Sequence, residues 1–322
     1  MKAYIYGANG PAISEVSKPA PNGAQVLVRV HACGLNRADL GMTKGHVHGS
    51  AGGVGTVLGI EWAGEVAEIG PDAKGVKVGD KVMGSGGGAF AEYTLADHGR
   101  LFRAPSNMNF EEAATLPVAL STMHNAVVTN GALQPGQSVL IQGASSGVGL
   151  MALQIAKLKG AKLVIGSSTD TMRRSRLKEF RADLAVDSSD PGWVDQVLRA
   201  TGGEGVDLII DQVSGKVASQ NLAATKIKGR IVNVGRLGGT HADFNFDLHA
   251  ARRIQYIGVT FRTRSIEEIR EIFDEVRKDI WPAVESRKLQ LPIDKVFAFD
   301  DIGKAFEHME ANRHLGKIVV TL

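Results

Sequence analysis

The stretch SVLIQGASSGVGL, residues 138–150, constrains the fold more than any other part of the chain. A short apolar run leads into a glycine-rich turn, and an apolar-striped segment follows. This order is typical of a buried strand that ends at a helix N-terminus, where backbone N–H groups and the helix dipole favour a phosphate. Gly147 and Gly149 carry no side chain that would obstruct a pyrophosphate. We therefore expect a dinucleotide site, although Ser146 replaces the middle glycine of the common GxGxxG pattern. The residues predicted to contact the pyrophosphate are Ser145, Ser146, Gly147 and Val148.

The remainder of the chain divides into two kinds of pattern. Glycine-punctuated strands in the first hundred residues, such as 25–32 with Val26, Val28, Val30 and Ala32 on one face, predict an all-β, barrel-like region. Capping signals at Asn109 and Ser265 predict helices over about 110–128 and 266–280. From Ser138 onward strands alternate with helices, which predicts a doubly wound parallel sheet. The predicted strands of that sheet are 139–141, 162–166, 184–186, 206–211, 230–234 and 255–260, and a last strand, 317–322, ends the chain.

Composition excludes several classes of protein. The 322 residues are 43% hydrophobic and 22% charged, as in a globular chain with room for two domains. The net charge is +3 with no dense basic block, so we expect neither a nucleic acid nor a membrane surface as partner. The single cysteine, Cys33, excludes an internal disulfide and a multi-thiolate zinc site. The sequence shows no signal-peptide core and no long apolar run, so a cytoplasmic location is expected.

The glycine-rich turn would also suit a short-chain dehydrogenase, whose catalytic Tyr lies four residues before a Lys. The four tyrosines of this chain are Tyr4, Tyr6, Tyr93 and Tyr256. None of them is followed by a lysine at that spacing, so this class is excluded.

The motifs HACGLNRADL, GGAFAEY, FEEAATLPVALST, GVDLIIDQVSG, GRIVNVG and GKIVV occur in this order along the chain. Together they resemble the zinc-free quinone oxidoreductase (zeta-crystallin-like) branch of the medium-chain dehydrogenase/reductase superfamily. The resemblance implies an α/β fold in which a Rossmann domain, residues 119–258, is inserted in a GroES-like β-barrel catalytic domain, residues 1–118 and 259–322. It further implies a substrate cleft between the domains and a homodimer joined near 255–260.

The resemblance also predicts that the site holds no metal. Asn36 stands where zinc-dependent relatives have a Cys ligand, and Ile60 stands in the place of their His. Without these ligands a Lewis-acid zinc is not expected. A rival interpretation pairs His46 and His48 with Glu61 as a different metal site.

The choice of nicotinamide cofactor depends on the residue at the end of the second strand of the parallel sheet. An NAD site needs a carboxylate there, and this position is the neutral Ser168. The hydroxyls of Ser168 and Thr169 with the guanidinium of Arg173 suit the 2′-phosphate of NADPH. Asp170 is an alternative ribose acceptor, but its position favours the N-cap of the following helix. We therefore predict NADPH.

The cofactor carries the chemistry, and the protein orients it. We expect hydride transfer to a quinone or to the C=C of an α,β-unsaturated carbonyl. The alternatives are a zinc-free alcohol or carbonyl dehydrogenase and an NADPH-binding protein with little turnover. Relatives carry a substrate-covering Tyr where this chain has Val47, so His46, His48 or water is expected to supply the proton. The predicted catalytic residues are Asn36, Asp39, Thr122 and His46. The resemblance further implies cofactor contacts beyond the turn and the phosphate site, at Asn36, Thr122, Ser188, Val213, Asn233, Val234, Gly235, Phe261, Arg262 and Asn312.

Overall fold

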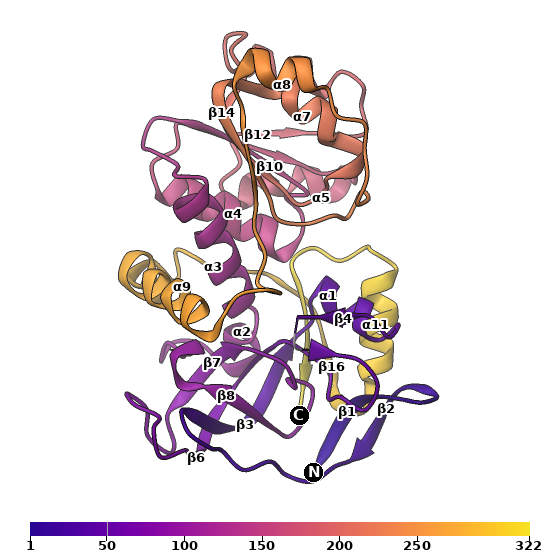
Figure 1. The fold of residues 1–322 in the computed structure, drawn as a ribbon, viewed down its shortest axis with the longest axis vertical. Coiled ribbons are helices and arrows are strands. Elements are labelled where there is room, and N and C mark those ends of the chain that lie inside the picture. Colours follow the sequence, from indigo (N-terminus) through magenta and orange to yellow (C-terminus); the bar gives the residue numbers. More distant parts are fainter. Residues whose placement is uncertain (50) are drawn as a thin grey trace. The chain divides into compact units, whose positions relative to one another are not determined.

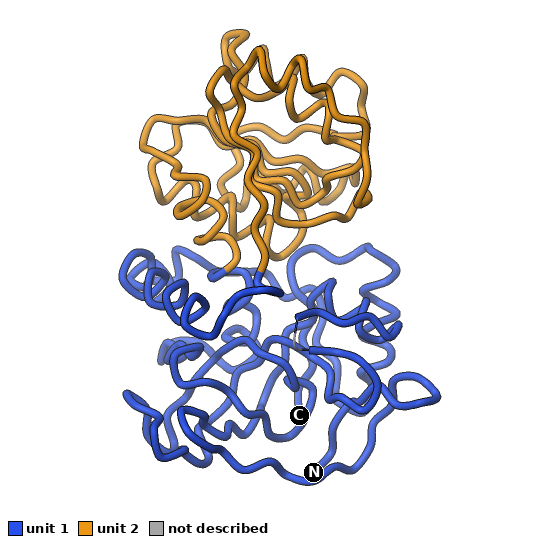
Figure 2. Tube along the Cα trace, in the orientation of Figure 1, with its two compact units in different colours: residues 1–121, 261–322 blue, residues 122–260 orange. Residues whose placement is uncertain are grey.

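The computed structural model describes residues 1–49 and 51–322 and shows two compact units (Figure 2). The first unit contains residues 1–121 and 261–322, so both ends of the chain build it. The second unit contains residues 122–260. The domain boundaries predicted from the sequence remain a prediction.

The second unit is built on a six-stranded sheet in which every neighbouring pair of strands is parallel (Figure 1). The strand order is β12-β11-β10-β13-β14-β15, the 3-2-1-4-5-6 order of a dinucleotide-binding sheet. This confirms the predicted doubly wound α/β fold. The strands are β10 (Ser138–Gln142), β11 (Leu163–Ser167), β12 (Leu184–Val186), β13 (Val206–Asp211), β14 (Thr225–Asn233) and β15 (Gln255–Gly258).

Helices pack against this sheet and bury its strand centres. Helix α4 contacts β10 and β11, and helices α7 and α8 contact β14. Leu140, Ile165, Ile209 and Ile231, one from each of four strands, are fully buried in the core of this unit. The helices are α4 (Gly147–Leu158), α5 (Thr171–Ser175), α6 (Trp193–Ala200), α7 (Ala218–Ala224) and α8 (Phe246–Arg252), with 3-10 turns η3 (Leu177–Phe180) and η4 (Gly215–Val217).

The first unit holds a seven-stranded sheet with the order β16-β17-β3-β6-β7-β9, to which β8 adds by pairing with β3. Only the β16–β17 pair is parallel, and the other pairs are antiparallel. The strands are β3 (Gln25–Gly34), β6 (Glu61–Ile69), β7 (Lys81–Ser85), β8 (Tyr93–Asp97), β9 (Leu101–Arg103), β16 (Ile293–Ala298) and β17 (Lys317–Thr321). Two hairpins accompany it, β1 (Lys2–Gly7) with β2 (Gly10–Glu15), and β4 (Val47–His48) with β5 (Ala51–Gly52).

Five helices described in the structure complete the first unit. They are α1 (Arg37–Met42), α2 (Phe110–Ala113), α9 (Ile266–Asp279), α10 (Trp281–Glu285) and α11 (Ile302–Glu310), with 3-10 turns η1 (His98–Arg100) and η5 (Phe299–Asp301). Helix α3 (Pro117–His124) crosses into the second unit and continues as the π-helix η2 (Asn125–Asn130). In the part of the chain that the structure describes, no helix combines the length and apolarity needed to span a bilayer. The expected cytoplasmic location stays a prediction.

Two local predictions differ from the structure. The single helix predicted over 110–128 is broken between α2 and α3. Pro117 explains the break, since proline lacks an N–H and disfavours helical backbone at the residue before it. In strand β3, Leu27 is as fully buried as Val26 and Val28, so the predicted one-sided burial is wrong there. Both predicted capping boxes are confirmed, at Asn109 with Glu112 and at Ser265 with Glu268.

Candidate active site in two half-sites

The predicted cofactor residues of the second unit gather at one edge of its parallel sheet. Because the strands are parallel, their carboxyl ends lie at the same edge, which is where nucleotides bind in folds of this kind. Each of five strands is followed there by predicted residues. They are Ser145–Val148 after β10, Ser168 and Thr169 after β11, Ser188 after β12, Val213 after β13, and Asn233–Gly235 at the end of β14 and just beyond it.

The glycine-rich turn leads directly into helix α4. Gly143 has a positive φ of 70°. Ser146 is the N-cap, and its Oγ accepts a hydrogen bond from Gly149 N at 3.0 Å. The first N–H groups of a helix have no partner within the helix. The backbone N–H groups of Gly147 and Val148 can therefore serve an anion at the positive end of the helix dipole.

Gly149 has a different role from the predicted one. A Cβ on this residue would lie 2.6 Å from Gly143 O and 2.7 Å from Ala144 Cα. Glycine is needed here so that the helix can pack against its own turn, rather than to keep a path open for the pyrophosphate.

The segment after β11 carries the predicted 2′-phosphate site. Ser168 is buried, and its Oγ donates to Ser145 Oγ at 3.1 Å. Asp170 caps α5 by accepting from Arg173 N at 2.8 Å, which confirms its predicted capping role. The Arg173 Nε also lies 3.6 Å from Asp170 Oδ1. The pKa of Asp170 is lowered, chiefly by the hydrogen bond from Arg173 N and to a smaller extent by the positive charge of the Arg173 side chain. This carboxylate is therefore already engaged at the helix start.

Arg174, beside Arg173, has a structural role. Its Nη1 donates to Ser168 O at 2.9 Å and to Asp187 Oδ2 at 2.8 Å. These contacts tie the segment after β11 to the segment after β12, where the predicted residue Ser188 is half-buried. Thr169 is exposed at the same edge.

Buried polar side chains form a hydrogen-bonded chain that links the ends of β10 and β13. The sequence analysis did not predict this chain. Ser167 Oγ donates to Gln142 Oε1 at 2.6 Å. Gln142 Nε2 donates to Asn221 Oδ1 at 2.8 Å, and Asn221 Nδ2 donates to Asp211 Oδ2 at 3.1 Å. Asp211 also accepts from the backbone N–H of Val213, and burial raises its pKa. The available signal was a polar residue closing each of two apolar strands, SVLIQ and VDLIID.

The end of β14 is fixed through the side chain of Asn233. Asn233 Nδ2 donates to Ser214 Oγ, and that hydroxyl donates to Gly235 O at 2.7 Å. A Cβ at Gly235 would lie 2.7 Å from Gln212 O, so this loop packs closely on the segment after β13. Val234, between Asn233 and Gly235 in the sequence, is partly exposed. Their contact with a cofactor remains a prediction.

Thr122 begins the second unit on helix α3 and is half-buried. Its neighbour Ser121 donates to Pro117 O at 2.7 Å, as a helical hydroxyl commonly does. No such bond to the backbone is seen for Thr122 among the residues described. Its predicted role under the nicotinamide stays a prediction.

In the first unit, Asn36 lies where three neighbouring strands meet. Strands β17 and β6 both run antiparallel to β3, so their first residues lie at the carboxyl end of β3. Asn36 Nδ2 donates to Gly34 O at 3.2 Å and to Glu61 Oε2 at 2.9 Å. Lys317 Nζ donates to Asn36 Oδ1 at 2.9 Å and to Glu61 Oε2 at 2.5 Å. We call Asn36, Asp39, Glu61 and Lys317 the Asn36 cluster.

Three of the four members of the Asn36 cluster are buried, and Asn36 itself is half-buried. Asp39 and Glu61 are fully buried, and Lys317 is 5% exposed. Asp39 Oδ2 accepts from Asn36 N at 2.7 Å, whereas its Oδ1 has no partner in the described part of the chain. Burial raises the pKa of Asp39 to about 7, although the hydrogen bond from Asn36 N and the charge of Lys317 act in the opposite direction.

The cluster also bears on the two metal hypotheses. The ammonium of Lys317, a fixed cation, contacts both Asn36 and Glu61, the side chains next to the position expected for zinc in relatives. The rival site of His46, His48 and Glu61 is not assembled, since His46 is exposed and Glu61 bonds Asn36, Lys317 and Val118 N. Within residues 1–49 and 51–322, no three His, Cys, Asp or Glu side chains gather as metal ligands would. Cys33 is buried and donates to Ala89 O.

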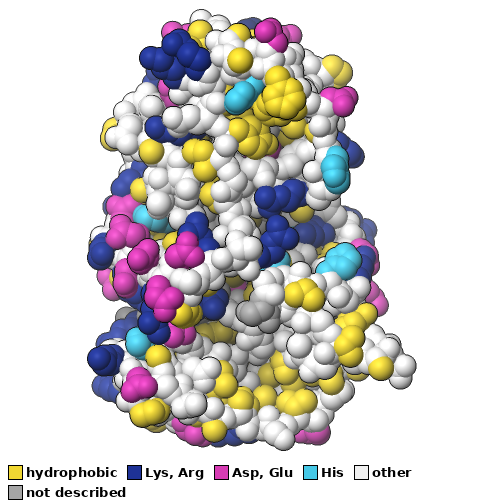
Figure 3. Space-filling model, in the orientation of Figure 1, with side chains coloured by type: hydrophobic (Ala, Val, Ile, Leu, Met, Phe, Trp, Pro, Cys, Tyr) yellow, Lys and Arg dark blue, Asp and Glu magenta, His cyan; other side chains and the backbone are white. Residues whose placement is uncertain are grey.

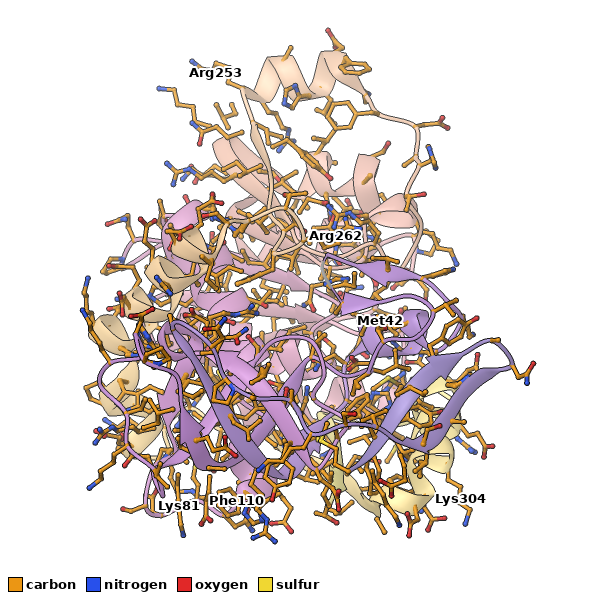
Figure 4. The ribbon with its side chains drawn as sticks, turned by 60° about the horizontal axis from the view of Figure 1, so that its bottom comes forward. Met42, Lys81, Phe110, Arg253, Arg262 and Lys304 are labelled. Atoms are coloured by element: carbon orange, nitrogen blue, oxygen red, sulfur yellow. The ribbon has the colours of Figure 1, made fainter. Side chains whose placement is uncertain are left out.

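His48 lies in the β4–β5 hairpin near Arg262, and His46 directly precedes the hairpin. A Cβ at Gly49 would lie 3.2 Å from Arg262 O, and one at Gly52 would lie 2.9 Å from Met42 Cγ, so the hairpin packs on both segments (Figure 4). Burial, and then the charge of Arg262, lower the pKa of His48.

The other two predicted residues of this unit lie in nearby turns. Asn312 follows α11 with a positive φ of 54°, and its Oδ1 accepts from Arg37 Nη2 at 2.9 Å. This bond ties the turn after α11 to the start of α1, next to Asn36. The Arg264 guanidinium carbon lies over the Phe261 ring, 6.0 Å from the ring centroid.

Family models match both parts of the chain. Residues 22–106 match "Alcohol dehydrogenase GroES-like domain", and residues 147–278 match "Zinc-binding dehydrogenase". The chain is 30% identical to mouse quinone oxidoreductase-like protein 2 over 313 residues, which cover 96% of this chain and 88% of that protein. It is also 30% identical to a phenolphthiocerol/phthiocerol polyketide synthase of Mycobacterium tuberculosis over 312 residues, 96% of this chain. The chain spans 14% of the length of that polyketide synthase.

Solved structures share the fold over the whole chain. An alcohol dehydrogenase superfamily protein from Novosphingobium aromaticivorans superposes with a TM-score of 0.88 at 29% identity, covering 100% of this chain and 99% of that one. CurK enoyl reductase gives 0.85 at 25% identity and 99% coverage of both chains. Fold and site together define a two-part oxidoreductase with a GroES-like domain and a nucleotide-binding parallel sheet. The chain belongs to the medium-chain dehydrogenase/reductase superfamily and, within it, to the quinone oxidoreductase family.

Proposed function

We propose that this protein is an NADPH-dependent oxidoreductase that reduces a quinone or the C=C of an α,β-unsaturated carbonyl without a metal. The cofactor is NADPH, which supplies the hydride when bound. The observation that carries the proposal is the edge of the parallel sheet. There the first turn of α4 follows Ser145, whose hydroxyl bonds that of Ser168, while the next carboxylate along the chain, Asp170, is engaged as a helix cap.

Each group of predicted residues has a place in this function. The N–H groups of Gly147 and Val148 bind the pyrophosphate, with Ser145 and Ser146 beside them. Ser168, Thr169 and Arg173 hold the 2′-phosphate. Asn36 and Thr122 orient the nicotinamide end, and Asp39 fixes the loop of Asn36 through its hydrogen bond to Asn36 N. His46, exposed on its loop, is the proposed proton donor, with water as the alternative.

The names of the relatives support both substrate classes. Quinone oxidoreductase-like protein 2 favours a quinone, whereas the polyketide synthase and CurK enoyl reductase favour an enone. The alternatives are a zinc-free alcohol or carbonyl dehydrogenase, which the Novosphingobium relative favours, and an NADPH-binding protein with little turnover. The deciding experiment mixes the protein and NADPH with a panel of quinones, enones and aldehydes and follows the nicotinamide absorbance. Turnover with aldehydes alone supports the first alternative, and binding without turnover supports the second.

Arg173→Ala tests the 2′-phosphate site. Loss of a charge-assisted bond should weaken NADPH binding by ~1.5–3 kcal/mol, about ten- to a hundredfold, and leave NADH binding nearly unchanged. Titration of each cofactor by fluorescence measures both constants. The matched control is Arg176→Ala, which removes an arginine paired with Glu179 in the same segment. Equal losses for NADPH and NADH would remove Arg173 from the phosphate site.

A further inference from the structure

A buried ammonium holds the side chain that is proposed to face the nicotinamide. Lys317 opens the last strand of the chain, and its side chain is 5% exposed against a fully buried Glu61. A buried charge is retained only where partners satisfy it, and here the partners are Glu61 and Asn36. No role in binding or catalysis was expected of Lys317 from the sequence.

The partners of Asn36 leave its amide one orientation. The ammonium of Lys317 can only donate, so the Asn36 atom that faces it is the oxygen. The Gly34 carbonyl and the Glu61 carboxylate can only accept, so the atom that faces them is the nitrogen. Both Nδ2 hydrogens are thereby engaged. The side chain retains one acceptor lone pair on Oδ1 and has no donor left for a ligand.

We propose that Lys317 is a positioning residue that sets the hydrogen-bond polarity of Asn36. Its ammonium turns the amide so that Oδ1 accepts from a ribose hydroxyl of the bound nicotinamide nucleotide, and so that Asn36 does not donate to the substrate carbonyl. This inference rests on the proposed function for its ligand. It assigns Asn36 to aligning the cofactor and leaves stabilisation of the substrate oxygen to other donors.

Close packing at Gly34 supports the same arrangement of Asn36, Glu61 and Lys317. A Cβ on Gly34 would lie 2.9 Å from Glu61 Oε2 and 3.2 Å from Lys317 Cε. The other oxygen of Glu61 accepts from Val118 N at 2.7 Å, so the carboxylate is anchored from helix α3 as well. Glu61 is thus held by Val118 N as well as by Lys317 and Asn36.

The first test is a measurement of hydrogen exchange, and it needs no substrate. In protein labelled with ¹⁵N at asparagine, the Asn36 Nδ2 hydrogens should exchange at least about a hundredfold more slowly than those of the exposed Asn9. In the doubly neutral variant Lys317→Met/Glu61→Gln, which leaves no unpaired buried charge at this pair, that protection should fall at least about tenfold. Asn36 hydrogens that exchange as fast as those of Asn9 in the unaltered protein would overturn the proposal.

The second test separates alignment from binding. In the double variant kcat should fall at least about tenfold, while the Kd of adenosine 2′,5′-bisphosphate, which lacks the nicotinamide end, should stay within about twofold. The matched control is Lys44→Met/Glu310→Gln, which neutralises an exposed Lys–Glu pair and should change neither value. An unchanged kcat with retained protection of Asn36 would refute the role of Lys317.

The two proposals fail in different ways. If none of the acceptors in the panel supports NADPH oxidation by the unaltered protein, the proposed function fails. The exchange measurement still decides the orientation of the Asn36 amide. If the double variant does not fold, the test of the proposal is the exchange of the Asn36 Nδ2 hydrogens in the unaltered protein, measured with and without NADPH. Protection that persists when NADPH is added supports an acceptor role, and protection lost on binding contradicts it.

Discussion

Asp39 is a carboxylic acid buried with one oxygen bonded to Asn36 N and the other without a partner in the described residues. Its pKa is about 7 in the folded protein, against about 3.9 in an unfolded chain. Between these values the folded state binds the extra proton, so the free energy of unfolding falls as pH rises from about 4 to about 7. Ionisation of this one group should cost about 4 kcal/mol at most above pH 7.

Asp39→Asn tests this expectation, because the amide is neutral at every pH and keeps an oxygen for Asn36 N. The stability gain of the variant should be smallest below about pH 4 and largest at pH 8. Denaturant titration at a series of pH values measures the difference, in which the other titrating groups cancel. Asp300→Asn, which removes an exposed carboxylate, is the control for a change of surface charge. A difference that stays constant with pH would mean that Asp39 titrates normally.

At the scale of elements, the close meeting of β3, β6 and β17 depends on Gly34. A Cβ at this position would lie 2.3 Å from Ala114 O, and backbone cannot move aside as a flexible side chain can. Gly34→Ala should destabilise the protein by about 1–3 kcal/mol through overpacking, and it should disturb the Asn36 cluster at the same time. Thermal and denaturant unfolding measure the loss.

Gly303→Ala is the matched control for Gly34→Ala, since Gly303 lies in helix α11 and a Cβ added there would have nothing within 4 Å. There alanine should add about 0.5–1 kcal/mol by its higher helix propensity. If both variants changed stability in the same direction, steric crowding at Gly34 would not be the cause.

Local patterns predicted the elements well, because the periodicity and the capping residues that decide them lie close together in the sequence. The strands of the parallel sheet and the capping boxes at Asn109 and Ser265 are of this kind. The residues predicted after the strand ends at Asn233, Val234 and Gly235 came from the family resemblance. What stayed hidden was contact between distant segments. Lys317 and Glu61 are 256 residues apart, and only the pairing of β17 and β6 with β3 brings them together.

At the scale of the whole molecule, the two units differ in construction. The first unit joins both ends of the chain and holds the Asn36 cluster, and the second unit is one continuous segment that holds the nucleotide edge. Each half-site rests on residues fixed by buried hydrogen bonds within its own unit, at Glu61 in one and at Gln142 and Asp211 in the other. A change in one half-site is therefore expected to leave the fold of the other unit intact.

The second unit also carries a surface suited to another copy of the chain. Strand β15 is the edge of the six-stranded sheet and, in the described part of the chain, pairs with β14 alone, so its other side offers a template for another strand. Phe244, Phe246 and Tyr256 form an aromatic group at this edge, and Phe246 is 75% exposed. Figure 3 shows hydrophobic side chains gathered over α8 on this face. We propose that two copies pair antiparallel along β15 around a two-fold axis.

Charges placed on this surface should separate the two copies. In Phe246→Asp/Tyr256→Asp, like charges would face each other across the two-fold axis, and burying them would cost more than the lost apolar contact alone. Sedimentation should give the unaltered protein twice the chain mass of 34.2 kDa and the variant a single chain. The control, Val296→Asp, places the same charge on a 43% exposed residue of β16, the edge of the other sheet, and should remain a dimer. A monomer before any substitution, or a dimer after the double one, would exclude β15 as the interface.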